Sequence, residues 1–238
     1  MFHKLFAFFF PDRCILCGQP LSGGAVCEHC VDKLTLCRDI HICKKCSRPI
    51  DENQLFCTNC AVTPHYFTIC FAAAVYEGEM RRSILKYKFY HHPEYYRGYA
   101  RLIYAHLLSF DMLPHFDMIA AAPLSDARQK ERGYNQAELI GKELARLMNL
   151  PFCKNCVRKI RHTNAQSTLS YRERRKNLEN TFRAERTEAI CGKTVLLVDD
   201  VFTTGTTADE ITKQLLKSGA KQVYVAVVAV TPLKDLAT

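Results

Sequence analysis

The stretch from residue 195 to 207, VLLVDDVFTTGTT, constrains the fold of this chain more than any other segment. Four apolar residues lead into Asp199 and Asp200, and a turn of small residues follows. A continuous apolar run of this kind is typical of a strand that is buried on both faces of a parallel sheet. Ligands of open parallel sheets bind beyond the carboxyl ends of the strands, so we expect a binding site at this turn.

The turn after the two acids has the composition of a phosphate-binding loop. Backbone amides, hydroxyls and the amino-terminus of the helix expected to follow all favour a monophosphate, and Gly205 lets the backbone approach the anion closely. Asp199 and Asp200 would repel a phosphate, so we expect them to accept hydrogen bonds from ribose hydroxyls instead. The predicted phosphate-binding residues of the loop are Thr203, Thr204, Gly205, Thr206 and Thr207.

Strands and helices alternate along the chain after residue 66. Continuous apolar runs predict strands at 67–77, 116–124, 193–198 and 223–230. Helical spacing of apolar residues predicts helices at 80–89, 94–109, 135–149 and 206–218. Alternation of this kind indicates an α/β fold, a parallel sheet covered by helices on both faces. Asn135 and Gln136 either cap the helix that begins there or touch a ligand.

Cysteine pairs dominate the chain before residue 66. Eight of the thirteen cysteines form four Cys-x-x-Cys pairs, and the pairs group into two quartets. Two such turns on adjacent ribbons complete a tetrahedron of thiolates, so we expect two structural Zn²⁺ ions. The alternative is that the cysteines form disulfides. Because zinc sites need free thiolates, we expect the protein to work in a reducing compartment. The pairing of the turns stays open. The predicted zinc ligands are Cys14, Cys17, Cys27, Cys30, Cys43, Cys46, Cys57 and Cys60.

The cysteine-rich region has few long apolar runs, so the metal must supply much of its folding free energy. We therefore expect two units, 1–65 with the zinc ribbons and 66–238 with the α/β domain. Residues 1–10, MFHKLFAFFF, are too few to span a bilayer. They are expected to form a short apolar helix on the body, with peripheral membrane contact as the alternative. Cys153 and Cys156 are expected to be two ordinary cysteines at the start of an edge strand, a redox pair or a metal half-site being the alternatives.

The net charge of +9 favours partners that carry phosphate, although a solvated basic surface is the alternative. Residues 154–176 hold eight cations and one acid, a balance that suits salt-dependent binding of nucleic acid. Nearby aromatic residues either stack on bases or pack against helices: Tyr87, Phe89, Tyr90, Tyr95 and Tyr96. The predicted DNA-binding residues are Arg161, Arg172, Arg174, Arg175 and Lys176.

Residues 195–207 resemble the phosphoribosyl pyrophosphate (PRPP) motif of type I phosphoribosyltransferases. The resemblance implies that Asp199 and Asp200 are the catalytic acids, which bind the ribose hydroxyls, and that the threonines bind the 5′-phosphate. It also implies a second loop for pyrophosphate and a Mg²⁺ ion that bridges pyrophosphate and ribose. In this chain the expected pyrophosphate-binding residues are Pro123, Leu124, Ser125 and Arg132.

The whole chain resembles the ComF family of competence proteins. The features that carry this resemblance are RGYNQAEL at 132–139, QSTLS at 166–170 and the cysteine quartets. The family implies a cytoplasmic protein that handles single-stranded DNA during natural transformation, in contact with other DNA-uptake proteins at the inner membrane. The alternative is an active phosphoribosyltransferase that uses Mg²⁺ and PRPP. No segment identifies its acceptor.

Overall fold

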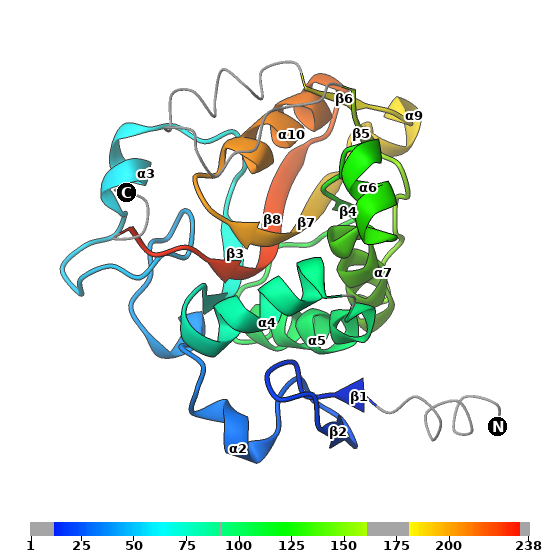
Figure 1. The fold of residues 1–238 in the computed structure, drawn as a ribbon. Helices are drawn as coiled ribbons and strands as arrows, with labels where there is room; N and C mark the ends of the chain where they lie inside the picture. Colours follow the sequence, from blue (N-terminus) through cyan, green and yellow to red (C-terminus); the bar gives the residue numbers. More distant parts are fainter. Residues whose placement is uncertain (1–11, 91, 161–180, 234–238) are drawn as a thin grey trace.

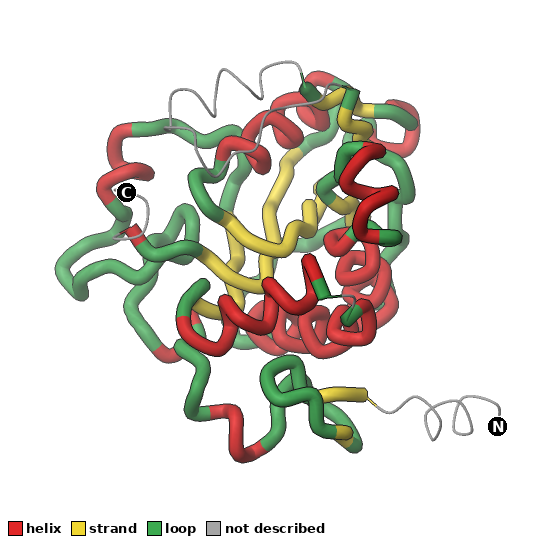
Figure 2. The backbone as a smooth tube through the Cα atoms, in the orientation of Figure 1, coloured by secondary structure: helices red, strands yellow, loops and turns green. Residues whose placement is uncertain are grey.

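The computed structural model describes residues 12–90, 92–160 and 181–233 (Figure 1). Its centre is a parallel sheet of four strands in the order β3-β8-β7-β4. The strands are β3 Cys70–Val75, β4 Met118–Ala121, β7 Thr194–Phe202 and β8 Gln222–Val230. All four coincide with the apolar runs from which strands were predicted, and helices lie on both sides of the sheet (Figure 2). The predicted α/β architecture is confirmed.

The two faces of the sheet build two separate cores. Because side chains alternate along a strand, Leu196 and Val198 point to one face while Val195 and Leu197 point to the other. The first face is covered by α4 Gly78–Phe89, α5 Tyr96–Leu107 and α7 Gln136–Met148. The second face is covered by α10 Thr206–Lys217. Each core therefore belongs to a different set of helices.

The amino-terminal region divides between these two cores. The first cysteine quartet lies around the short pair β1 Asp12–Arg13 and β2 Pro20–Leu21 and the helix α2 Glu28–Val31, and its residue Ile15 packs in the core with α4 and α5. The second quartet, with η1 Cys37–Asp39 before it and α3 Thr58–Val62 at its end, packs in the core of α10. A short turn of 3-10 helix, η2 Pro93–Tyr95, precedes α5.

Local signals explain where the helices begin and end. The Asn135 side chain accepts a hydrogen bond from the Glu138 amide at 3.3 Å, so Asn135 is the N-cap of α7. A further helix, α6 Asp126–Arg132, was not predicted, because DARQKER has no apolar stripe. Ser125 caps its start and Gly133, at φ 78°, ends it.

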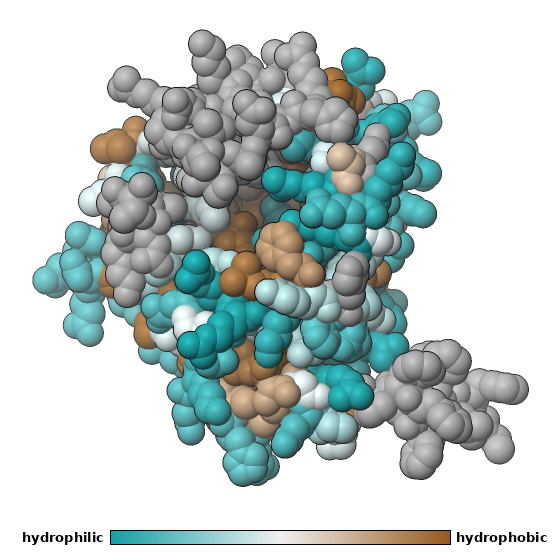
Figure 3. Space-filling view, viewed as in Figure 1, coloured by the Kyte–Doolittle hydropathy of each residue, from teal (hydrophilic) through white to brown (hydrophobic). Residues whose placement is uncertain are grey.

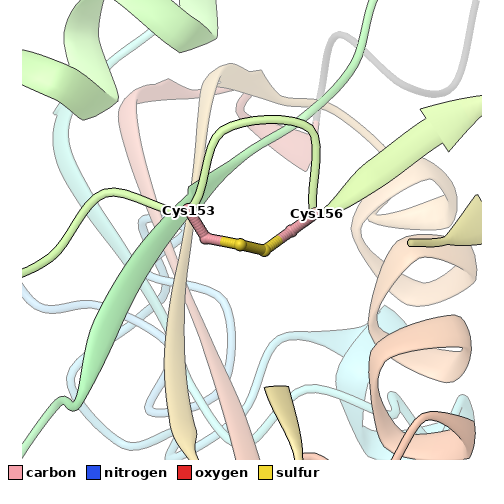
Figure 4. Close-up of a disulfide and its surroundings, with 2 residues drawn as sticks. All are labelled: Cys153 and Cys156. Atoms are coloured by element: carbon pink, nitrogen blue, oxygen red, sulfur yellow. A yellow bond between two sulfur atoms is a disulfide. The ribbon is translucent and has the colours of Figure 1, made fainter. Parts of the chain in front are cut away.

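An antiparallel hairpin of β5 Val157–Lys159 and β6 Phe182–Ala184 lies at the border of the sheet, and α9 Thr187–Ile190 follows it. Cys153 and Cys156, immediately before β5, are joined by a disulfide (Figure 4). The expectation of two ordinary cysteines is wrong on this point, because the turn at Asn155, with φ 57°, brings the two sulfur atoms together. No helix within the described ranges is long and apolar enough to cross a bilayer.

Candidate functional site

A hollow of about 240 Å³ opens at the carboxyl ends of β4 and β7. Both strands are parallel neighbours, so the residues that follow them meet at one edge of the sheet. The predicted site residues that line the hollow are Pro123, Leu124, Ser125, Arg132, Asp199, Asp200, Thr203 and Thr207. Segments that are far apart in the sequence therefore form one polar cavity at the place where the parallel sheet predicts a ligand.

The middle of the threonine loop (residues 203–207) does not line the hollow with its side chains. Thr204 and Thr206 are buried, and their hydroxyl oxygens lie 2.8 Å apart. Gly205 has φ 82° and precedes α10, and a Cβ atom there would lie 2.6 Å from the ring of Phe202. The loop therefore turns tightly, and the first amides of α10, which have no partner within the helix, begin beside Thr203 and Thr207.

The two acids differ in their surroundings. Asp200 accepts a hydrogen bond from the ammonium group of Lys88 at 2.8 Å, whereas Asp199 accepts one from the backbone amide of Asp200 at 2.8 Å. Burial, followed by the negative charge of Asp200, raises the pKa of Asp199 to about 7. The pair thus presents one carboxylate that is neutralised by a lysine and one carboxyl group that titrates near neutral pH.

Cations from three elements surround these acids. Lys88 comes from the last turn of α4, Arg128 and Arg132 come from α6, and Lys159 ends β5. Arg132 donates a hydrogen bond to the Gln136 side chain at 3.1 Å, and its guanidinium lies 5.0 Å from the centroid of the Phe89 ring. Hydrophilic side chains gather over α6 on this face of the molecule (Figure 3). The hollow therefore holds both cations for an anion and acids for hydroxyl groups.

Two buried donors at the hollow have no partner in the described part of the chain, Arg132 Nε and Gln136 Nε2. Buried polar groups are nearly always hydrogen-bonded in folded proteins, so these two atoms are available to a ligand. Burial also lowers the pKa of Arg132 from its usual range, although the nearby charge of Asp200 raises it. Both residues lie in the RGYNQ segment. In this segment Asn135 caps α7, and Asn135 and Gln136 both line the hollow.

Lys88, Lys159 and Phe182 line the hollow although the sequence did not single them out as site residues. Lys88 lies in a helix that leads away from the sheet edge, and only tertiary packing brings its ammonium group to Asp200. Lys159 and Phe182 face each other across the β5–β6 hairpin, with the ammonium group 5.8 Å from the ring centroid. A lysine in a basic stretch was the single sequence signal for this pair.

The predicted DNA-binding residues lie outside the described residues, because all five fall within 161–180. The two ends of that segment are described: the Ile160 amide donates to the Thr181 carbonyl at 2.8 Å. Among the aromatic candidates, Tyr87 and Tyr95 are buried and pack in the core, whereas Phe89 and Tyr90 are exposed. Of the two expected roles, packing against helices therefore holds for Tyr87 and Tyr95, and stacking on bases does not.

The eight predicted zinc ligands form two separate clusters. Within each quartet the four sulfur atoms lie within 4.8 Å of one another, and the quartets do not interleave. A tetrahedral zinc with Zn–S bonds of about 2.3 Å places its sulfur atoms about 3.8 Å apart. The Cys17–Cys27 and Cys46–Cys57 sulfur pairs lie at 3.7 Å. Both quartets therefore fit a structural zinc ion that is fully enclosed by protein ligands.

Comparisons with known proteins agree with both parts of the chain. The double zinc ribbon domain matches residues 5–61, and the phosphoribosyl transferase domain matches residues 135–235. The "DNA utilization protein YhgH" of Escherichia coli O157:H7 is 32% identical over 222 residues, which are 90% of this chain and 95% of that protein. "Competence protein F" of Haemophilus influenzae is 31% identical over 223 residues, which are 91% and 96% of the two chains.

A search of solved structures finds the glutamine PRPP amidotransferase of Bacillus subtilis in complex with ADP and GMP. It is 17% identical, has a TM-score of 0.40, and the match covers 60% of this chain and 30% of that one.

Proposed function

This chain belongs to the ComF family, with competence protein F and the DNA utilization protein YhgH, and from that premise we propose that it handles single-stranded DNA during natural transformation and binds a ribose phosphate of the PRPP type in its polar hollow. The observation that carries the proposal is the convergence of the two acids, the threonine loop and the Pro123–Ser125 segment on one cavity. In this proposal the protein works in the cytoplasm, beside DNA-uptake proteins of the inner membrane.

Each part of a ribose phosphate has a chemical counterpart in the hollow. Asp199 and Asp200 accept hydrogen bonds from the ribose hydroxyls, while Thr203, Thr207 and the first amides of α10 receive the 5′-phosphate. Arg132 is placed to neutralise a pyrophosphate over the Pro123–Ser125 segment. Mg²⁺ accompanies PRPP as a bridge between pyrophosphate and ribose, and it is held by ligand oxygens more than by the protein.

In this proposal, residues 161–180, which hold the five predicted DNA-binding residues and are called the basic segment, connect the hollow to DNA. The basic segment leaves the described structure after β5 and re-enters it before β6, and both strands contribute a residue to the hollow, Lys159 and Phe182. The ends of the segment are therefore fixed at the rim of the cavity. Its arginines would track a phosphodiester backbone through counterion release, while the cavity holds a terminal nucleotide unit of the same strand.

The same geometry supports a second candidate, an active phosphoribosyltransferase. Two adjacent carboxyl groups at the end of a strand can stabilise positive charge on a ribose ring as pyrophosphate leaves when they are ionised, and a perturbed pKa such as that of Asp199 is common at catalytic sites. The two functions separate in one assay. A transferase releases pyrophosphate from PRPP when an acceptor is supplied, whereas a binding protein returns PRPP unchanged.

A competition experiment tests the proposed function. Zinc-replete protein is loaded with a fluorescent single-stranded oligonucleotide, and Mg²⁺ with PRPP is titrated while anisotropy is followed. Release of the DNA by PRPP indicates a shared pocket, as proposed. DNA that stays bound while PRPP binds elsewhere separates the two sites and favours the transferase.

The basic segment is tested with the same oligonucleotide. Arg172→Ala, Arg174→Ala and Arg175→Ala together should weaken DNA binding and reduce the slope of log K against log salt by about 2 to 3. Arg81→Ala with Arg82→Ala removes exposed cations from α4 and serves as the control, with no change in slope expected. An unaltered slope in the triple variant removes the segment from the DNA path.

A further inference from the structure

Arg48 is a fully buried cation that reaches from the second zinc ribbon to the candidate site. It is 1% exposed, and it follows the zinc ligand Cys46 by two residues. Its Nε donates a hydrogen bond to the Thr231 carbonyl at 3.0 Å, and its Nη2 donates one to the Thr203 carbonyl in the threonine loop. The guanidinium also lies 5.6 Å from the centroid of the Phe202 ring. One side chain thus joins the ribbon, the end of β8 and the loop.

The backbone of Arg48 is part of the second zinc knuckle. The Cys43 amide donates to the Arg48 carbonyl at 2.8 Å, and the Ser47 amide donates to the Cys43 carbonyl at 2.9 Å. Ser47 takes the left-handed conformation, φ 59°, and its hydroxyl donates to the Cys70 carbonyl at 2.7 Å. The position of the Arg48 side chain therefore depends on the folded knuckle, in which these hydrogen bonds are formed.

The charge of Arg48 also points to the metal. No carboxylate in the described residues forms an ion pair with it, and a buried cation without compensation is costly. Zn²⁺ with four thiolates carries a net charge of about −2. A zinc ion in the second cluster, whose ligand Cys46 lies two residues before Arg48 in the chain, would supply an opposite charge near Arg48.

The hydrogen bond to Thr203 fixes the start of the threonine loop. A peptide group is planar and trans, so a carbonyl of Thr203 that points to Arg48 directs the Thr204 amide to the opposite side. The next residue, Gly205, has φ 82°, and a Cβ atom there would lie 2.6 Å from the Phe202 ring and 3.2 Å from the His65 ring, so the loop packs closely against both rings. The orientation of the loop amides is thus set from the side of the zinc ribbon.

We propose that Arg48 is a positioning residue that links zinc occupancy of the second quartet to the ligand-binding conformation of the threonine loop. This inference rests on the proposed function, because it assumes that the loop binds a ribose phosphate. Linkage is reciprocal for binding free energies: bound zinc strengthens ribose phosphate binding, and bound ribose phosphate tightens the binding of this zinc by the same factor. The first quartet packs in the other core and has no such effect.

The first test compares two changes in the same ribbon. Arg48→Lys keeps the charge but cannot donate to both carbonyls, and it should weaken binding of Mg²⁺ with PRPP by about tenfold and speed hydrogen exchange of the amides at 203–207. Lys45→Met is the control, because the Lys45 ammonium donates to the carbonyls of Phe67 and Thr68 and does not touch the loop. It should lower the melting temperature and leave both readouts unchanged.

The second test follows the metal. Cys17→Ser leaves zinc in the second quartet alone. Because differences in affinity appear mostly in the dissociation rate, release of this zinc to a chromophoric chelator should slow about tenfold when Mg²⁺ and PRPP are added. Adding Arg48→Lys to this variant should abolish the protection. Cys60→Ser leaves zinc in the first quartet, whose release should be the same without PRPP and at a concentration of Mg²⁺ and PRPP that saturates this variant.

The outcomes separate the inference from the proposed function. If the wild-type protein does not bind PRPP, the proposed function fails, and faster exchange at 203–207 in Arg48→Lys alone would still support positioning of the loop. If wild-type and Arg48→Lys proteins bind PRPP equally well and exchange at equal rates, the inference is overturned while the proposed function stands. Equal slowing of zinc release from both quartets would also overturn it.

Discussion

Asp199 and Asp200 are neighbours in the chain, yet their side chains meet different environments. Asp200 pairs with Lys88 at 2.8 Å, while Asp199 is buried next to another negative charge. The sequence identified both acids as site residues but could not distinguish them, because Lys88 reaches Asp200 from a helix more than a hundred residues earlier in the chain. The asymmetry between the two carboxyl groups is therefore a product of tertiary packing.

This asymmetry predicts how stability depends on pH. The pKa of Asp199 in the folded chain, about 7, is above its ordinary value of 3.8. The contribution of Asp199 to stability is therefore full below the ordinary pKa and is lost as the pH rises through about 7. At pH 8 the wild-type chain must bury a charge that Asp199→Asn lacks.

We expect Asp199→Asn to be more stable than wild type at pH 8, by on the order of 2 kcal/mol, with the difference shrinking toward pH 5. Thermal unfolding in steps of pH measures it. Asp51→Asn, at an exposed site of the second ribbon, should follow the wild-type curve at every pH. A constant offset between Asp199→Asn and wild type would show that the pKa of Asp199 is not raised.

At the scale of elements, the apolar runs predicted the four strands and the periodic segments predicted the four long helices. Strand β7 extends beyond the predicted end at residue 198, because Asp199 to Phe202 pair with Val227 to Val230. The acids thus lie on a rigid strand end. An edge strand was expected at Cys153 and Cys156, and β5 begins at Val157, but α6 and the pairing of β5 with β6 were not predicted. These elements are short and polar, so their caps and tertiary contacts decide their structure.

The start of α10 requires a glycine at position 205 for two reasons: a positive φ angle, and the lack of space for a Cβ atom. Gly192 shares only the first of these and serves as the comparison. Gly205 has φ 82° and its added Cβ would meet Phe202, whereas Gly192 has φ 73° and open space around an added Cβ. Gly192→Ala should cost about 1 kcal/mol of unfolding free energy from backbone strain alone. Gly205→Ala should cost about 2 kcal/mol more and weaken ribose phosphate binding, because Phe202 must move.

Denaturant titration of the two variants measures the difference. Equal losses in Gly205→Ala and Gly192→Ala would mean that Phe202 yields easily and does not brace the threonine loop.

On the scale of the whole molecule, the amino-terminal region is built into both cores of the α/β domain. Ile15 of the first ribbon packs against α5 so closely that a Cβ at Gly98 would lie 2.4 Å from it, and Cys43, Cys46 and Cys57 of the second ribbon pack with the residues under α10. The spacing of the cysteines predicted the zinc ligands. It did not predict this packing, because the packing depends on contacts between residues far apart in the sequence. The unit boundary at residue 65 stays a prediction.

The separation of the quartets predicts the metal content of the chain. The wild-type protein should bind two equivalents of zinc, while Cys17→Ser and Cys60→Ser should each retain one. Metal analysis after gel filtration measures these values. If either single variant lost both metals, the two quartets would be coupled, against the separate packing described above. Loss of the second metal should lower the melting temperature more, because three of its four cysteines are buried, against two in the first quartet.

The central claim is that the hollow at the ends of β4 and β7 binds a ribose phosphate through Asp199 and Asp200. Calorimetric titration of zinc-replete protein with PRPP in the presence of Mg²⁺ tests it most directly, with Asp199→Asn and Asp200→Asn combined as the variant and Asp51→Asn as the control. We expect PRPP to bind the wild-type and control proteins and not to bind the double variant. PRPP binding of equal strength in the double variant would contradict the assignment of these acids.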